Sequence, residues 1–278
     1  SGVLPEHTLE GYSLALAQGA DVIEPDLVIS RDGELVVRHD ATLARSTDVA
    51  AHIGFGDRMR DGDWPVDAFD IDELALLRAR QPFAQRDPSH DGRYRIPSFV
   101  DALAWADRSA RDRGAPVLLY PELKHVEDFA RRGRDPVPRF IELARRVDSA
   151  AVRLWLQCFE PDPLRRVAER LDLPRFLLRD ADADWRADLR RYAGEVHGLA
   201  VAKSLLHDHR GNDSGLVAEA HARGLQIHVW TYRDDLLPTG ASSVDEELDH
   251  AFALGVDALF CDFPATGLAR RARFAATS

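Results

Sequence analysis

The sequence is poor in cysteine and has no long apolar run. Its 278 residues include only two cysteines, Cys158 and Cys261, and two isolated thiols make neither a disulfide framework nor a zinc site. The longest apolar stretches, such as residues 117–120, have the length of a strand, whereas a membrane-spanning helix needs roughly 18 apolar residues. We therefore expect no stable membrane insertion.

Positive charge is also scarce. The chain has 36 Lys and Arg against 47 Asp and Glu, a formal net charge of −11. Proteins that bind nucleic acid by neutralising its phosphates need the opposite balance, so we expect no nucleic-acid partner. A small phosphorylated substrate is still compatible with this charge, because a bound metal ion can reverse the local sign. No signal peptide or lipidation motif is visible.

Short apolar runs alternate with amphipathic segments along most of the chain. The first predicted element is a helix over residues 8–17, which ends at Gly19. The predicted strands that follow cover residues 22–30, 34–39, 116–120, 152–157, 175–178, 199–202, 226–231 and 258–260. Helices are predicted over 98–111, 138–147, 185–192, 214–223 and 244–254, and after Pro163 and Pro264. Such alternation is typical of parallel βα units.

The number of strands favours a barrel with one strand outside the sequence. Leaving aside the hairpin strand 34–39, seven strands are predicted, and a TIM barrel has eight. Because the first element is a helix, we expect the first strand to precede Ser1. An open, doubly wound sheet is the alternative, but the sequence has no GxGxxG turn to support it. We predict an α/β fold, a TIM (β/α)₈ barrel, as a single domain over 1–278.

Residues 41 to about 95 interrupt this alternation. They are mostly polar and rich in Asp, Gly and Pro, with one short helix predicted near residues 72–77. Long loops in compact domains are often functional. We expect this insertion after the second strand to overhang the active-site rim and to influence the depth and selectivity of the pocket.

Acidic residues lie where two strands are predicted to end. Glu24 and Asp26 share one face of their strand, and Pro25 between them favours a position at the strand's C-terminal end. Glu122 and Lys124 follow a later apolar strand in the same way. In a barrel, these strand ends form the catalytic rim. Three carboxylates meeting there would share a cation, and oxygen ligands favour Ca²⁺ or Mg²⁺ over Zn²⁺. Any one acid alone is more simply explained as solvated or salt-bridged.

Histidine and aromatic residues mark further strand ends. His39 ends the hairpin strand, and histidine is the commonest proton donor to a leaving alkoxide at neutral pH. The chain has 11 histidines, so a surface role explains any single one equally well. Phe159 and Trp230 follow or end two later strands, where they are placed either to shape a small-molecule pocket or to pack at the top of the barrel.

Several segments, taken in order, resemble glycerophosphodiester phosphodiesterases. They are LPEHTLE at 4–10, QGADVIEPDLV at 18–28, VVRHD at 36–40, TLARSTDVA at 42–50, YPELK at 120–124, LQCF at 156–159, VWTYR at 229–233 and LFCDFP at 259–264. The resemblance spans essentially the whole chain. The PEHT and LQCF segments look most like the bacterial periplasmic branch of the family.

The resemblance implies a TIM-barrel enzyme that hydrolyses small-molecule glycerophosphodiesters, such as glycerophosphocholine, to sn-glycerol 3-phosphate and an alcohol. By the same comparison, one divalent cation, Ca²⁺ or Mg²⁺, is bound by Glu24, Asp26 and Glu122. His39 matches one catalytic histidine. The residues that match substrate-binding positions are Lys124, Phe159 and Trp230. The branch resemblance also implies a periplasmic or secreted protein.

One family motif lies outside the sequence. The family's first strand ends in His-Arg-Gly, whose histidine is the second catalytic one, and we expect this motif just before Ser1. His209-Arg210-Gly211 follows no apolar strand and is interpreted as a coincidence. A non-catalytic glycerophosphodiester-binding homologue is one alternative. A sphingomyelinase D-like phospholipase is another, which a disulfide loop after the first histidine would favour. An enolase-type Mg²⁺ enzyme, with a lysine base at a strand end, is a third.

Overall fold

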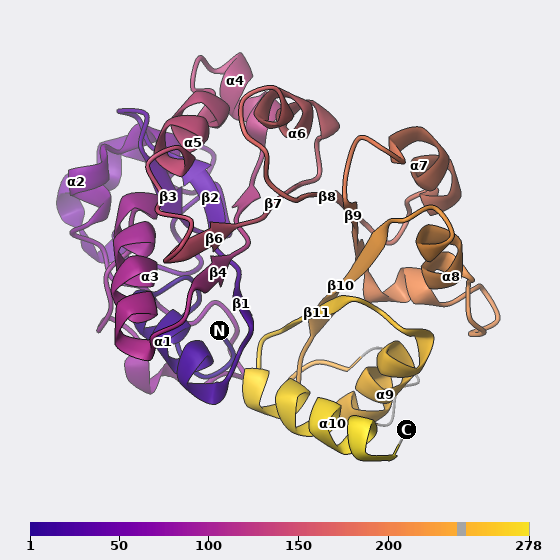
Figure 1. Ribbon diagram of the computed structural model, residues 1–278. Helices are drawn as coiled ribbons and strands as arrows, with labels where there is room; N and C mark the ends of the chain where they lie inside the picture. The colour runs from indigo at the N-terminus through magenta and orange to yellow at the C-terminus, as the bar shows by residue number, and fades with distance from the viewer. Residues whose placement is uncertain (238–242, 278) are drawn as a thin grey trace.

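Helices surround a strongly curved, mostly parallel sheet in the computed structural model, which describes residues 1–237 and 243–277 (Figure 1). Three of the parallel strands are each broken once and resume. These pairs are β1 (Val22–Ile23) and β2 (Asp26–Ile29), β4 (Val117–Leu119) and β5 (Glu122–Leu123), and β6 (Val152–Leu154) and β7 (Leu156–Cys158). The remaining parallel strands are β8 (Arg175–Arg179), β9 (Gly198–Ala202), β10 (Gln226–Tyr232) and β11 (Ala258–Cys261).

The breaks divide the ladder into the strand orders β1-β4-β6 and β11-β10-β9-β8-β7-β5-β2-β3. The predicted strand over 22–30 is therefore wrong as one continuous element. Pro25 has no N–H to donate to the ladder, but its carbonyl accepts from the Glu122 amide at 3.0 Å. Pro121 accepts in the same way from the Gln157 amide at 2.9 Å. The backbone thus stays hydrogen-bonded across the breaks.

The predicted hairpin is confirmed. β3 (Leu35–Val37) pairs antiparallel with β2, with Leu27 opposite Val37, and both strands are fully buried. The turn between them contains Gly33 at φ +86°, a conformation that side chains other than glycine rarely adopt.

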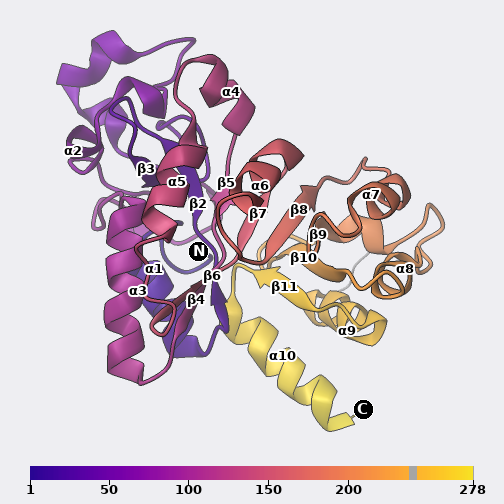
Figure 2. The same ribbon diagram turned by 45° about the horizontal axis from the view of Figure 1, so that its top comes forward.

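The helices pack on the outside of the sheet (Figure 2). They are α1 (Leu9–Gln18), α3 (Phe99–Arg113), α4 (Val126–Arg131), α5 (Pro136–Ala144), α6 (Pro161–Ala168), α7 (Trp185–Tyr192), α8 (Leu216–His221), α9 (Val244–Leu254) and α10 (Pro264–Thr277). Local signals explain several boundaries: the Thr8 hydroxyl accepts from the Gly11 amide, and Ser98 and Asp101 form a capping box. The sequence pattern did not predict α4. Within the described residues, no helix is long and apolar enough to span a bilayer.

The two edges of the parallel sheet approach each other without pairing. α10 packs against α1, and the Gly2 amide donates to the Asp262 carbonyl at 2.9 Å. Within the described residues, no ladder joins β11 to β1. The architecture is therefore that of a TIM-type α/β barrel whose ring of strands is open at this position.

The insertion over 41–95 has an apolar core of its own. It consists of turns of 3₁₀ helix, η1 (Val49–Ala51), η2 (Ile53–Arg58), η3 (Val66–Ala68) and η4 (Pro88–His90), and of α2 (Ile71–Leu74). Its buried side chains include Leu43, Trp64 and Phe69, which cluster with Val28 and Val36 of the hairpin. The composition suggested a polar loop, but these widely spaced apolar residues fold it onto the face of the hairpin that carries Val28 and Val36.

Candidate active site

Three carboxylates meet at the breaks in the sheet. Glu24 lies in the break between β1 and β2, Asp26 begins β2, and Glu122 begins β5 directly beside it, in register with Asp26. One carboxylate oxygen from each residue lies within 4.8 Å of the other two. Residues nearly 100 positions apart in the chain thus form one carboxylate cluster at the rim, as the sequence predicted.

Lys124 is the cation beside this cluster. Its Nζ lies 3.2 Å from Glu122 Oε1 and 3.7 Å from Asp26 Oδ1. Burial alone would lower the pKa of Lys124, but Asp26, Glu122 and Glu24 outweigh burial and raise it. Lys124 therefore stays charged and offsets one of the three carboxylates.

The three carboxylates differ in their readiness to ionise. Burial, with the charge of Asp26, raises the pKa of both Glu24 and Glu122 well above the ordinary value. Burial also acts to raise the pKa of Asp26, but Lys124 and His7 outweigh it and hold that pKa well below its usual range. Asp26 is thus the persistent anion, and the two glutamates would ionise fully only with further positive charge nearby.

The donor set fits a hard divalent cation. Every candidate ligand atom is a carboxylate oxygen, the type that Ca²⁺ and Mg²⁺ prefer. Asp26 Oδ1 is buried and accepts no hydrogen bond, and because Lys124 Nζ lies 3.7 Å from it, beyond hydrogen-bond distance, this oxygen is available as a ligand atom. With all three carboxylates ionised, their sum with Lys124 is −2, so a divalent ion would favour that ionisation and bring the cluster to neutrality.

His7 is a further residue of the site that sequence reasoning missed. Its Nε2 lies 3.0 Å from Asp26 Oδ2, and its Nδ1 lies 3.0 Å from the Tyr12 hydroxyl. His7 has φ +56°, an unusual backbone conformation that turns the ring toward the cluster. The available signal was its place in the PEHT segment, but no spacing rule connects that segment with Asp26.

His39 follows β3 at the solvent-facing edge of the site. Its Nδ1 lies 2.6 Å from Asp40 Oδ1, and Arg45 Nε donates to the other oxygen of Asp40 at 2.6 Å. The hydrogen bond to Asp40 raises the pKa of His39 despite partial burial, and the charges of Lys124 and Asp26 also act on it. With the His39 side chain 49% exposed, its other nitrogen is accessible to a ligand.

Phe159 and Trp230 form an aromatic wall near the ends of β7 and β10. Their rings meet edge to face with centroids 6.0 Å apart, and Trp230 Nε1 donates to the Ala200 carbonyl at 3.1 Å. Gln157, two residues before Phe159, donates to Glu24 Oε1 at 2.9 Å. This bond, which the sequence did not reveal, links the aromatic side of the rim to the carboxylate cluster.

The insertion reaches the same end of the barrel. The Arg86 side chain is only 1% exposed and lies between Asp235, at 2.9 Å, and Asp262, at 2.5 Å. These acids follow β10 and β11. Arg86 therefore attaches the insertion to the segments that follow two strands.

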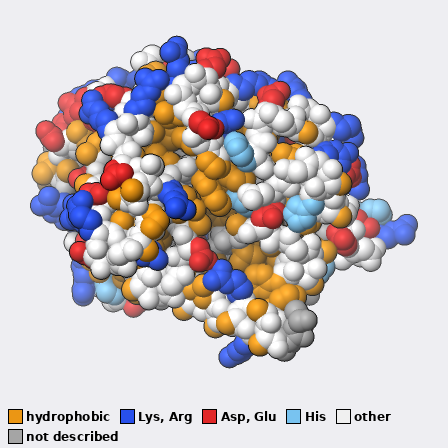
Figure 3. Space-filling model, viewed as in Figure 1, with side chains coloured by type: hydrophobic (Ala, Val, Ile, Leu, Met, Phe, Trp, Pro, Cys, Tyr) orange, Lys and Arg blue, Asp and Glu red, His pale blue; other side chains and the backbone are white. Residues whose placement is uncertain are grey.

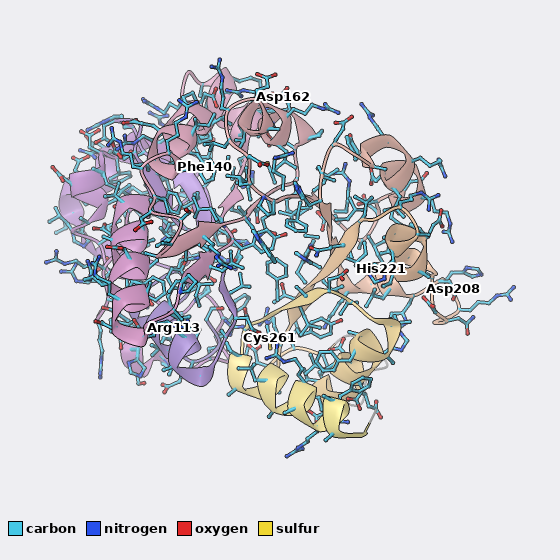
Figure 4. The ribbon with its side chains drawn as sticks, viewed as in Figure 1. Arg113, Phe140, Asp162, Asp208, His221 and Cys261 are labelled. Carbon is cyan, nitrogen blue, oxygen red and sulfur yellow. The ribbon has the colours of Figure 1, made fainter. Side chains whose placement is uncertain are left out.

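Other candidates lie elsewhere. The loop that carries His209-Arg210-Gly211 begins beside Asp208, at the outer edge of the molecule (Figure 4). Cys158 and Cys261 are both free thiols.

Figure 3 shows apolar side chains along the middle of one face, between flanks where charged side chains gather.

The chain is similar to known proteins over nearly its whole length. The profile of the glycerophosphoryl diester phosphodiesterase family matches residues 1–266. A glycerophosphodiester phosphodiesterase of Arabidopsis thaliana is 29% identical, over 95% of this chain and 81% of that protein. One from Haemophilus influenzae is 28% identical, over 96% of this chain and 86% of that protein.

Solved structures show the same fold. A phosphodiesterase from Oleispira antarctica, in complex with the product sn-glycerol-3-phosphate, superposes with a TM-score of 0.71 at 21% identity. The match covers 98% of this chain and 93% of that one. A glycerophosphodiester phosphodiesterase from Agrobacterium tumefaciens has a TM-score of 0.64 at 20% identity, over 96% and 94% of the two chains.

Proposed function

Because the chain belongs to the glycerophosphoryl diester phosphodiesterase family, we propose that it hydrolyses glycerophosphodiesters, such as glycerophosphocholine, to sn-glycerol 3-phosphate and an alcohol. The observation that carries this proposal is the meeting of Glu24, Asp26 and Glu122 within 4.8 Å beside a buried Lys124. Three carboxylates in this arrangement would hold a divalent cation, and that cation would attract the negatively charged phosphate of the substrate.

Glu24, Asp26 and Glu122 would hold one divalent cation, Ca²⁺ or Mg²⁺. When bound, such an ion stabilises the negative charge that develops on the phosphoryl oxygens. Lys124 offsets one carboxylate and is positioned to attract the phosphate. Without the divalent ion, the cluster has no net positive charge to attract the substrate, whose phosphate carries a charge of −1.

His39 is the proton donor in this proposal. Hydrolysis forms a bond between phosphorus and the water oxygen, which releases one proton, and breaks the bond between phosphorus and the alcohol oxygen, which takes one up. Asp40 holds His39 Nδ1 at 2.6 Å, so the proton on Nε2 passes to the departing oxygen. The raised pKa of His39, caused first by Asp40, keeps that proton available near neutral pH. Phe159 and Trp230 form the pocket wall.

The periplasmic or secreted location is also a proposal, supported by the PEHT and LQCF segments alone. Fractionation of cells that express the complete gene tests it. Recovery of the protein in the periplasm or the medium is expected, and recovery only in the cytoplasm would contradict it.

The function is tested by measuring glycerophosphocholine turnover by the full-length protein, with and without a chelator of divalent cations. We expect chelation to reduce turnover to background and added Ca²⁺ or Mg²⁺ to restore it. Glu24→Gln removes one proposed ligand and should reduce turnover by about 10³-fold, because the metal contributes several kcal/mol to transition-state stabilisation.

Glu142→Gln is the matched control for Glu24→Gln. Glu142 lies on α5 and pairs with Arg139 and Arg146 at the surface, so this variant should keep full activity. Turnover that a chelator does not change would refute the metal role, and the absence of turnover under every condition would refute the hydrolase assignment.

A further inference from the structure

A second charged region lies on the insertion side of the molecule and has no part in the proposed reaction. A cavity of about 600 Å³ opens where the hairpin turn, the insertion and the segment between α4 and α5 meet. The residues that line it are Arg31, Asp57, Arg58, Arg60, Asp67, Ala68, Arg132 and Arg134. We call it the arginine cavity. Its volume lies in the range of small-molecule sites.

The arginine cavity is separate from the carboxylate cluster. Arg31 follows Asp26 by five residues along the extended hairpin, which corresponds to roughly 16 Å of strand. The hairpin therefore carries the carboxylate cluster at one end and the arginine cavity at the other. Figure 1 shows β3, α2 and α4, which flank the cavity, on the same side of the molecule.

The charge at the cavity is positive in a chain whose net charge is −11. Five arginines and two aspartates line the cavity, a sum of +3, which the adjacent carboxylates of Asp70 and Glu73 reduce to +1. Three of the arginines have carboxylate partners: Arg31 pairs with Asp70 at 2.6 Å, Arg58 with Glu73 at 2.5 Å, and Arg132 with Asp67 at 2.9 Å.

Two arginines are left for a ligand. The Arg134 guanidinium donates to the Arg31 carbonyl, which satisfies only part of its capacity. Over residues 1–237 and 243–277, neither Arg134 nor Arg60 forms an ion pair. Planar guanidinium groups without carboxylate partners are well suited to bind two oxygens of a phosphate.

Asp67 adds a second requirement. Its side chain is only 5% exposed, and while one oxygen pairs with Arg132, the buried Oδ1 accepts no hydrogen bond. A buried carboxylate oxygen without a donor is costly. Because Asp67 lines the cavity, a small rotation of its carboxylate would bring Oδ1 to the cavity surface, where a ligand hydroxyl would supply the missing donor. The ligand thus needs an anionic group for the arginines and a hydroxyl for Asp67.

We propose that the arginine cavity binds a hydroxyl-bearing phosphate ester. Arg60 and Arg134 hold the phosphate oxygens, and Asp67 Oδ1 accepts from a hydroxyl of the same ligand. Two sources share this chemistry: a free sugar or polyol phosphate, and the inositol phosphate head group of a lipid.

The test measures binding to the full-length protein in the presence of a chelator, so that the carboxylate cluster holds no cation. Glucose 6-phosphate is titrated by calorimetry, and vesicles with and without phosphatidylinositol are used in co-sedimentation. We expect one of these probes to bind, and the Arg60→Gln/Arg134→Gln double variant to weaken binding at least 10-fold. The probe that binds identifies the source of the ligand.

Two controls separate this site from general electrostatic attraction. Arg108→Gln/Arg153→Gln removes the same charge from two exposed arginines on α3 and β6 that do not line the cavity, and it should bind as the wild type does. Arg60→Gln alone removes no side-chain hydrogen bond or ion pair between described residues, so it should weaken binding several-fold without disturbing the fold. It replaces the double variant if loss of Arg134 disturbs folding.

Asp67→Asn tests the hydroxyl contact. The wild type should prefer glucose 6-phosphate, or the inositol lipid, over inorganic phosphate, and Asp67→Asn should reduce that preference. The proposal is overturned if neither probe binds. It is equally overturned if the cavity and control double variants bind alike, or if inorganic phosphate binds as tightly as the sugar phosphate.

Discussion

The carboxylate cluster and the arginine cavity lie at opposite ends of one hairpin and handle charge in opposite ways. At the cluster, Glu122 and Lys124 are 7% and 8% exposed, and three carboxylates share one lysine. At the arginine cavity, the side chains of Arg31 and Arg132 are 41% and 38% exposed, and acidic partners compensate three of the five arginines. Like charges are therefore crowded in both regions, but only at the cluster are they removed from water.

The difference in burial has a physical consequence. In a buried site, the interaction between charges is strong enough to shift pKa values and to require a cation. At a partly exposed site, water and salt screen the same charges, so an array of arginines is tolerated at little cost. The first arrangement is suited to bond breaking, and the second to reversible recognition of an anion.

The largest effect is expected on turnover, and only from a change at the active-site rim. His39→Gln should lower glycerophosphodiester turnover by about 10²–10⁴-fold, because it removes the proton donor to the leaving group. Binding at the arginine cavity should not change. Steady-state kinetics of the full-length protein, together with the titration described above, measures both quantities.

His209→Gln is the control for His39→Gln. It changes a histidine of the outlying loop and should leave turnover unchanged. Full activity in His39→Gln would show that the proton comes from elsewhere, and an equal loss in both variants would point to a general effect of histidine replacement.

A smaller effect is expected on the pH dependence of the stability of the folded protein. His228 lies among Tyr120, Trp155 and Phe176, with its Nδ1 3.0 Å from the Tyr120 hydroxyl. Burial lowers the pKa of His228 to about 4 from 6.5. Between pH 6.5 and 4 the unfolded chain binds a proton that the folded protein does not, so stability is lost as the pH falls. The expected loss from this group is about 3 kcal/mol.

Urea unfolding at pH 7 and pH 4 measures this effect. The free energy of unfolding should fall by about 3 kcal/mol less in His228→Gln than in the wild type. Glutamine keeps a polar group that can bond to Tyr120 but has no titration in this range. Equal pH dependence in the two proteins would mean that His228 is already accessible to protons in the folded state.

The smallest effect is expected beside the arginine cavity. Arg58 and Glu73 form a 2.5 Å ion pair with side chains 22% and 26% exposed. A double-mutant cycle with Arg58→Gln and Glu73→Gln should give a coupling of about 0.5–1 kcal/mol. Measurement at 0.5 M salt should reduce it. A coupling of several kcal/mol that salt does not reduce would show that water and salt do not screen the charges at the arginine cavity, contrary to the difference described above.

Much of the fold was predictable because it depends on local patterns. The boundaries of α7 and α9 agree with the predicted ranges 185–192 and 244–254, since each has an amphipathic pattern and an N-cap residue at its start. The strand ends that carry Glu24, Asp26, Glu122 and Lys124 were located for a similar reason. Each pair of charged residues directly follows a short apolar run, which is a local pattern, although Pro25 breaks the strand that was expected to carry Glu24 and Asp26 on one face.

The elements that were missed depend on contacts between distant segments. α4 is six residues long, too short to show a clear helical period. The insertion looked polar because its apolar residues are dispersed, and only packing on Val28 and Val36 collects them. The contact of His7 with Asp26 depends on a left-handed backbone turn that residue type alone does not specify.

The sequence by itself determined the order of strands and helices and the acidic residues at the strand ends, because hydrophobic period and residue spacing are properties of neighbours in the chain. Tertiary structure alone decided that Glu122 lies beside Asp26, that Lys124 is buried between them, and that arginines from three segments surround one cavity. The reason is that electrostatic energy depends on distance and burial. Both are set by the whole folded chain.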